Sequence, residues 1–241
     1  AGQLSARQLT GLDDSHLVSL DCGHLLQPEV AHAFVALQAD ARTAGFELAA
    51  ASSYRSFERQ LQIWNGKASG VRPVHDDHGE LVSLLSLPPT DRLHAILRFS
   101  AMPGTSRHHW GTDLDVFDAA AVAEGYEVQL TPQEVAPGGV FDALHCWLDE
   151  RMAQDRSHGF YRPYAIDRGG VAPERWHLSY APLSIICATG FSGELLQCCW
   201  DSEMGPDPLQ LREEIDRNIE ELIARYVTVP EDWCVVRSGM E

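Results

Sequence analysis

The segment "SRHHWGTDLD", residues 106–115, concentrates two adjacent histidines, a glycine and two aspartates within ten positions. The alternation of "GTDLDVFD" (111–118) predicts a β-strand. Gly111 permits a sharp bend before this strand, which would aim Asp115 back toward His108 across the six residues that separate them. A histidine and an aspartate at this spacing also occur by chance, so the segment alone leaves a metal site and a solvated loop open.

A second fragment, "ERWH" at residues 174–177, offers the remaining groups for metal-assisted hydrolysis. Catalytic zinc usually keeps three protein ligands and one open position. His108, Asp115 and His177 can supply three ligands, which leaves Glu174 as a general base. A glutamate at a strand end and a buried histidine are commonplace, so this fragment is informative only together with the first.

Arg55 lies in "SSYRS", where a predicted strand gives way to a predicted helix. A fixed guanidinium near a metal can stabilise the oxyanion of a tetrahedral intermediate. The alternative is a surface arginine at a helix start, which is the unfavourable end of the helix dipole for a cation. That electrostatic cost favours a functional role.

Taken in order, "SSYRSFERQ", "SRHHWGTDLD" and "ERWHLSY" resemble the three signatures of the zinc D-alanyl-D-alanine carboxypeptidases and dipeptidases of the vancomycin-resistance type. The central family pattern is Ser-x-His-x-x-Gly-x-Ala-x-Asp, and the last is Glu-x-Trp-His or close to it. The resemblance spans roughly residues 28–181. It implies one Zn²⁺ per chain, the metal ligands His108, Asp115 and His177, the catalytic residues Glu174 and Arg55, and the pocket-shaping residues Ser106 and Gln60.

The sequence departs from the central pattern at Asp113, which replaces the small family residue two places before Asp115. Strand alternation puts both side chains on one face, so we expect Asp113 to orient a metal ligand, unless it crowds the metal and changes the ligand set. Of the paired histidines, the pattern selects His108, which leaves His109 as a packing neighbour. The "HDDH" at 75–78 has liganding residues but no third partner, so no metal role is expected there.

The remaining periodicities predict helices at 27–45, 54–66, 138–154 and 206–227, strands at 46–54, 111–118, 158–164 and 174–181, and an irregular insertion at 67–91. Strands and helices do not alternate as in a doubly wound fold. We therefore expect an α+β fold with a small, mainly antiparallel sheet flanked by helices. Residues 1–181 would form the peptidase domain, with 182–241 as a helical extension packed on it. This extension, whose outer face is acidic, is also a candidate homodimer contact.

The chain of 241 residues carries 35 acidic and 18 basic residues, a net charge of −17. Nucleic acid and anionic membrane surfaces need a positive field, so neither is an expected partner. No apolar run approaches the ~20 residues of a membrane span. Seventeen of the bases are arginines, eight of them between Arg92 and Arg175. Arginine binds carboxylates in a fixed geometry, so this region suits a small peptide substrate ending in D-Ala.

None of the six cysteines forms a Cys-x-x-Cys pair, and the chain is too large to depend on disulfides. The first residues lack the features of a signal peptide. These observations favour reduced cysteines and a cytoplasmic location, with a periplasmic one if a leader was removed.

The expected function is removal of the terminal D-alanine from a peptidoglycan-type peptide or from free D-alanyl-D-alanine. One alternative keeps the zinc chemistry but cleaves internal cell-wall bonds, although no repeated wall-binding module is visible. Another is a non-catalytic zinc-binding interaction domain. Glu174 and Arg55 argue against that reading, because a structural zinc site needs neither.

Overall fold

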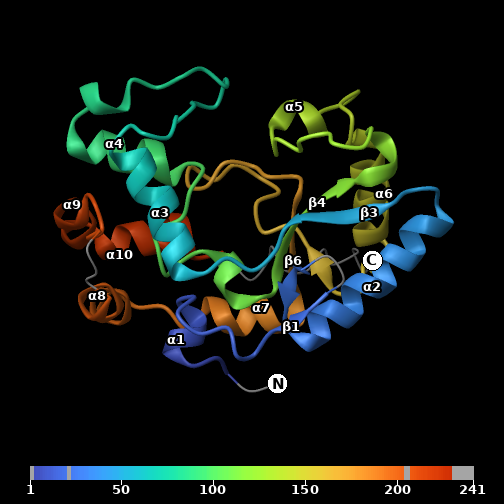
Figure 1. Cartoon of the computed structure of the whole chain (residues 1–241), viewed down its shortest axis with the longest axis horizontal. Coiled ribbons are helices and arrows are strands. Elements are labelled where there is room, and N and C mark those ends of the chain that lie inside the picture. Colours follow the sequence, from blue (N-terminus) through green and yellow to red (C-terminus); the bar gives the residue numbers. More distant parts are fainter. Residues whose placement is uncertain (1–2, 21–22, 204–206, 230–241) are drawn as a thin grey trace, which may run out of the picture.

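Four short strands form one antiparallel sheet at the centre of the computed structural model, which describes residues 3–20, 23–203 and 207–229 (Figure 1). The spatial order is β3 (Leu48–Ser52), β4 (Asp113–Asp118), β6 (His177–Tyr180) and β5 (Phe160–Tyr161). A separate pair joins β1 (Val18–Ser19) to β2 (Leu25–Leu26). The two central strands of the main sheet thus carry two of the three predicted metal ligands, Asp115 and His177.

One face of the sheet is apolar, and two helices cover it. Leu114 and Val116 of β4 are fully buried against α2 (Pro28–Thr43) and α6 (Asp142–Ala153). Figure 1 shows these helices along one side of the sheet. Because side chains alternate along a strand, the intervening aspartates of β4 face the other way.

The second apolar core lies across the molecule, where α3 (Phe57–Ala68) and α4 (Pro89–Leu97) meet the C-terminal helices α8 (Gly193–Ser202), α9 (Arg212–Arg217) and α10 (Ile219–Leu222). Trp64 is fully buried there, and its Nε1 donates to Gln210 O at 3.0 Å. Trp200 Nε1 donates to Pro103 O at 2.8 Å. Residues from both sides of position 181 therefore share one core, while the division into two domains stays a prediction.

The remaining elements are short. They are α1 (Ala6–Leu9), α5 (Pro132–Val135), α7 (Ala181–Ala188), the 3₁₀ helices η2 (Leu84–Ser86), η3 (Arg107–Trp110) and η4 (Ala119–Ala121), and the π-helical turn η5 (Ile223–Val227). Within the described ranges, no helix has the length and apolar character that crossing a bilayer requires.

The predicted fold class is confirmed, and the helices expected at 27–45, 54–66 and 138–154 are α2, α3 and α6. The continuous helix expected over 206–227 is wrong. Leu211 has a positive φ of 62°, and a further break at Asn218 divides the segment into α9, α10 and η5. Helix α4 begins inside the segment expected to be irregular, where Pro89 occupies the first helical turn, a position that proline favours.

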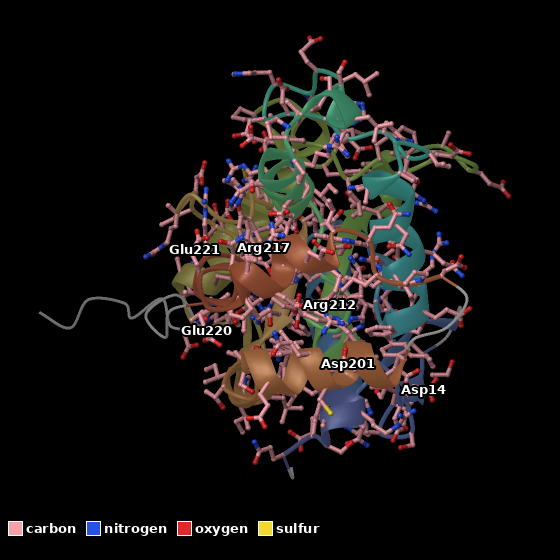
Figure 2. All side chains as sticks on the ribbon, turned by 90° about the vertical axis from the view of Figure 1, so that its left-hand side faces the viewer. Asp14, Asp201, Arg212, Arg217, Glu220 and Glu221 are labelled. Carbon is pink, nitrogen blue, oxygen red and sulfur yellow. The ribbon has the colours of Figure 1, made fainter. Side chains whose placement is uncertain are left out.

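The outer face of the C-terminal helices is charged but largely paired (Figure 2). Arg212 pairs with Asp201 at 3.0 Å and with Asp216 at 2.8 Å. Arg217 pairs with Glu214 at 2.7 Å, while Glu220 and Glu221 are exposed. A homodimer contact on this face stays a prediction.

Candidate metal centre

The register of β4 and β6 brings two of the predicted ligands together. Asp115 lies directly opposite His177 in this antiparallel pair, so their side chains project from the same face. On the other side of β4, Asp115 pairs with Ser52 of β3 next to a β-bulge. The carboxylate therefore comes from the middle of the sheet, where the backbone is held on both sides.

The third ligand comes from the 3₁₀ turn before β4. Gly111 ends this turn with φ 71°, a conformation that lets the chain reverse from η3 into the strand. A Cβ at this position would lie 2.3 Å from Leu17 Cδ2. His108 Nδ1 donates to Ser53 O at 2.8 Å, so Nε2 carries the lone pair that faces the strands.

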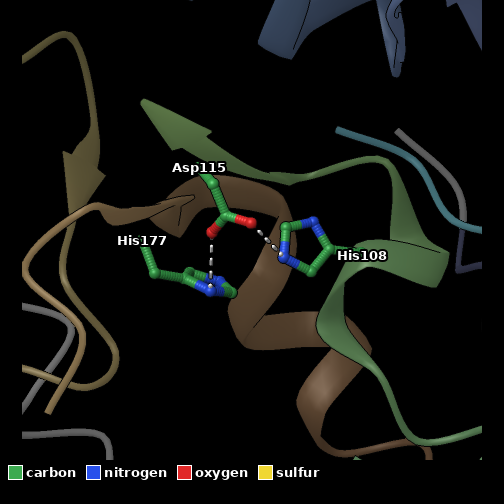
Figure 3. A group of neighbouring side chains, drawn as sticks. All are labelled: His108, Asp115 and His177. Carbon is green, nitrogen blue, oxygen red and sulfur yellow. Dashed lines mark ion pairs between the residues drawn. The ribbon is translucent and has the colours of Figure 1, made fainter. Parts of the chain in front are cut away.

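His108, Asp115 and His177 form a buried cluster whose candidate ligand atoms all lie within 4.8 Å of one another. Figure 3 shows the carboxylate between the two imidazoles, with His108 Nε2 at 3.4 Å and His177 Nδ1 at 3.5 Å from its oxygens. Asp115 Oδ1 is buried, and no hydrogen-bond donor reaches it among the described residues. Two imidazole nitrogens and an orphaned carboxylate oxygen are the donor set and arrangement of a three-ligand zinc site.

Asp113 fixes the orientation of His177. Its Oδ1 accepts from His177 Nε2 at 2.8 Å and from Arg107 Nε at 2.9 Å, and its Oδ2 accepts from Ser179 Oγ at 3.1 Å. Burial alone would raise the pKa of Asp113, but Arg107 and His177 bring it well below its usual value. The residue that departs from the family pattern is thus an ionised carboxylate behind a metal-facing imidazole, an arrangement that orients such ligands in zinc sites.

The surroundings of His177 favour the charged imidazole, with a second proton on Nδ1. Burial opposes the charged imidazole, but hydrogen bonds to Asp113 and Glu174 raise the pKa of His177 to about 10. Because a metal binds the neutral ring, an arriving cation has to displace this proton.

Glu174 and Arg55 line the same cavity as the cluster from two different loops, one before β6 and one between β3 and α3. Glu174 Oε2 is 3.2 Å from His177 Nδ1, and the backbone N–H of Glu174 donates to Tyr164 O at 2.9 Å. Arg55 Nη1 donates to Gln60 Oε1 at 3.0 Å. Burial lowers the pKa of Arg55, while the negative charges of Asp115 and Glu174 act in the opposite direction.

A cavity of about 220 Å³ opens onto the cluster. It is lined by Arg55, Phe99, Ser100, Ala101, Ser106, Arg107, His108, Asp115, Leu130, Tyr164, Val171, Glu174, Trp176 and His177. Hollows of about 440 and 590 Å³ lie elsewhere, but neither contains the cluster. The smaller cavity is therefore the candidate substrate site.

The structure brings all the predicted site residues to this region, in different ways. Ser106 lines the cavity directly, whereas Gln60 reaches it through Arg55. His109 is buried and packs behind the site, where its Nδ1 donates to Arg55 O. The "HDDH" loop lies outside the cluster, and Asp76 accepts from the backbone of its own turn.

Sequence reasoning missed several cavity residues. Tyr164 and Ser100 line the cavity although no motif marks them. Arg107 was overlooked as the partner of Asp113. The sequence indicates this ion pair only through two opposite charges that lie six positions apart across a turn.

The buried cluster of two histidines and one aspartate, beside a glutamate and an arginine, is the arrangement expected of a metal-dependent hydrolase. The chain belongs to the D-alanyl-D-alanine carboxypeptidase family, whose model, VanY, matches residues 23–183. This confirms the enzyme class that the three motifs predicted.

Similar proteins were found in sequence and in structure. Two curated relatives come from Haemophilus influenzae, and both are described as uncharacterized. One is 45% identical over 104 residues, which is 42% of this chain and 71% of the relative. The other is 34% identical over 126 residues, which is 51% of this chain and 89% of the relative. The structure of VanYB in complex with D-Alanine-D-Alanine has a TM-score of 0.48 at 21% identity and covers 78% of this chain and 88% of that one. A VanY D,D-pentapeptidase mutant solved with Zn(II) has a TM-score of 0.48 at 24% identity and covers 75% and 88%. The family assignment rests on the sequence match.

Proposed function

We propose that the chain binds one zinc ion through His108, Asp115 and His177 and hydrolyses the terminal peptide bond of substrates ending in D-alanyl-D-alanine. The convergence of three buried ligand atoms, one of them an orphaned carboxylate oxygen, carries the proposal. Membership of the carboxypeptidase family and the Zn(II) complex of a VanY protein support the choice of metal and reaction.

Zinc, when bound, supplies a Lewis acid that polarises a carbonyl and lowers the pKa of water. Glu174 accepts a proton from the attacking water and later delivers it to the leaving amine, because its carboxylate lies 3.2 Å from a ligand nitrogen without being needed as a ligand. Arg55 donates to the oxygen of the scissile carbonyl, where negative charge develops. Gln60 holds the guanidinium in place for this role.

The test is product analysis by mass spectrometry on D-alanyl-D-alanine, a pentapeptide stem and whole muropeptides, each with and without a chelator. We expect release of free D-alanine, abolished by the chelator and restored by zinc. Cleavage of internal bonds with no release of D-alanine would favour the endopeptidase alternative. If the zinc-loaded protein cleaves none of these substrates, the non-catalytic zinc-binding alternative replaces the proposal.

We propose a cytoplasmic location, supported by the free thiols of Cys146, Cys187, Cys198 and Cys199. Cys22 and Cys234 lie outside the described residues. Burial raises the pKa of Cys187 to about 12, so at pH 8 this thiol should resist iodoacetamide until the protein unfolds. The exposed Cys146 should react in the native protein, as peptide mapping would show. Loss of fold in mild reductant would instead indicate an exported protein.

A further inference from the structure

The chain has a single lysine, Lys67, and it lies in the last turn of α3, close to the cavity. Its side chain is partly buried, and Nζ donates to Ser100 Oγ at 2.6 Å. Burial lowers the pKa of this ammonium, and the like charges of Arg72 and Arg55 lower it further. The position is therefore electrostatically unfavourable for a cation.

No carboxylate in the described part of the chain lies within salt-bridge distance of Lys67 Nζ. The negative charge of Glu174 favours the ammonium but offsets the effect of burial on its pKa only in part. A partly buried charge without a counter-ion is costly, so a site that retains one commonly gains a partner from a ligand.

The arginines that could bind an anion are mostly committed elsewhere. Each of five central arginines already pairs with at least one aspartate: Arg98, Arg107, Arg151, Arg162 and Arg175. Arg92 donates to the backbone carbonyls of Leu87 and Leu85. Lys67 differs from these five arginines because its ammonium donates to a neutral hydroxyl and has no carboxylate partner among the described residues.

The serine that carries this hydroxyl lies in the wall of the candidate substrate site. Ser100 lines the cavity together with Arg55 and the metal cluster. Two hydrogen bonds join helix α3 to this wall of the cavity: Lys67 Nζ donates to Ser100 Oγ, and Gln60 Nε2 donates to Ala101 O at 2.7 Å. A serine hydroxyl that accepts from an ammonium still has its own proton to donate. Ser100 can therefore donate into the cavity while Lys67 supplies positive charge behind it.

We propose that Ser100, supported by Lys67, binds the free C-terminal carboxylate of the substrate. The proposal rests on the proposed peptidase function and names the group that makes the enzyme act at a chain end. In a peptide ending in D-alanyl-D-alanine, the carboxylate belongs to the residue that follows the scissile amide. Its binding group must lie in the same cavity as the metal site, and Ser100 lines that cavity. An internal peptide bond presents no such anion.

The experiment compares two substrates that differ only in this charge: acetyl-D-alanyl-D-alanine and its C-terminal amide. The wild-type protein should favour the acid in kcat/KM. Lys67→Met, which removes the charge at similar length, should raise KM for the acid by at least about tenfold, the loss expected for a hydrogen bond to a charged group, and leave kcat and the amide largely unchanged. Ser100→Ala should reduce the same preference.

Two controls separate charge from packing. Lys67→Arg should retain most of the preference for the acid. Arg59→Met removes a cation from the exposed face of the same helix and should leave the acid-to-amide ratio at its wild-type value. Zinc content and thermal unfolding should match wild type in every variant compared.

A binding measurement distinguishes failure of this proposal from failure of the peptidase function. Calorimetry with N-acetyl-D-alanine and its amide needs no turnover, and the acid should bind more tightly to the wild type but not to Lys67→Met. An acid preference that survives intact in both Lys67→Met and Ser100→Ala, in kinetics or in binding, would overturn the proposal. Absence of hydrolysis with the binding preference present would defeat only the proposed reaction.

Discussion

Glu174 separates catalysis from metal binding at the scale of a single residue. Glu174→Gln keeps the size and hydrogen-bonding capacity of the side chain but cannot accept a proton. We expect zinc content near wild type and hydrolysis slowed by at least about 100-fold, the lower range for loss of a general acid–base group. Steady-state kinetics with metal analysis on the same samples provides the measurement. A variant as fast as wild type would show that the proton goes elsewhere.

Asp113 is the residue at which this chain departs from its family pattern, and its contacts predict a role in metal affinity. Asp113→Asn removes the negative charge that accepts from His177 Nε2. We expect zinc affinity to fall by about 10–100-fold, the usual cost of losing such a partner. Competition with a chromophoric chelator measures this directly.

The matched control for that variant is Asp118→Asn. Asp118 lies on the same strand, but it accepts from the backbone of Glu47 and Ala120 rather than from a metal-facing residue. Its replacement should lower stability without changing zinc affinity. Equal losses of affinity in the two variants would mean that Asp113 acts only through the strand.

Sequence alone predicted the three residues that form the buried cluster, because the residue types and their order along the chain match a known motif pattern. It could not predict which histidine nitrogen faces the metal. That choice depends on Ser53 O and Asp113, which become neighbours of the rings only when the strands pair. Ser100 was missed for the same reason: serine is common, and only the approach of α3 gives this one a charged partner.

At the scale of elements, the turn between η3 and β4 sets the distance between His108 and Asp115. Gly111→Ala forces a side chain into a left-handed conformation and against Leu17. We expect a loss of about 2–4 kcal/mol in the free energy of unfolding, combining backbone strain and overpacking, together with weaker zinc binding. Urea unfolding and chelator competition measure the two effects.

Gly45→Ala isolates the backbone contribution. Gly45 has φ 92°, and no atom within 4 Å would meet its Cβ. The variant should lose about 1–2 kcal/mol, with unchanged zinc affinity. If both glycine variants lose the same stability and retain zinc equally, the turn does not control the ligand geometry.

Periodicity predicted β4 and α2 well because a single buried face dictates their sequence. It failed over 206–227, where the apolar spacing is helical but the backbone is not continuous. Ile215 and Leu222 are both fully buried in the core shared with α3 and α4, so packing preserves the apolar stripe while Leu211 and Asn218 interrupt the helix. Hydrophobic spacing reports which side chains are buried and does not report local backbone breaks.

At the scale of the whole molecule, the core arrangement predicts that the segment after residue 181 unfolds together with the rest of the chain. Trp200 of α8 is buried and donates to Pro103 O, just before the 106–115 segment, and Trp64 of α3 donates to Gln210 O. Opening the C-terminal helices would expose both indoles and the fully buried Leu93 and Ile96 of α4. Such an opening should cost close to the full free energy of unfolding.

Hydrogen exchange followed by mass spectrometry tests this cooperativity. Peptides from α2, which packs on the sheet, and from α8 should report the same free energy of opening in rising urea. A truncated chain ending at residue 188 should fail to fold, because it leaves the apolar faces of α3 and α4 uncovered. If α8 instead exchanges through a low-energy opening while α2 stays protected, and the truncated chain binds zinc, the C-terminal segment is a separable extension of the peptidase.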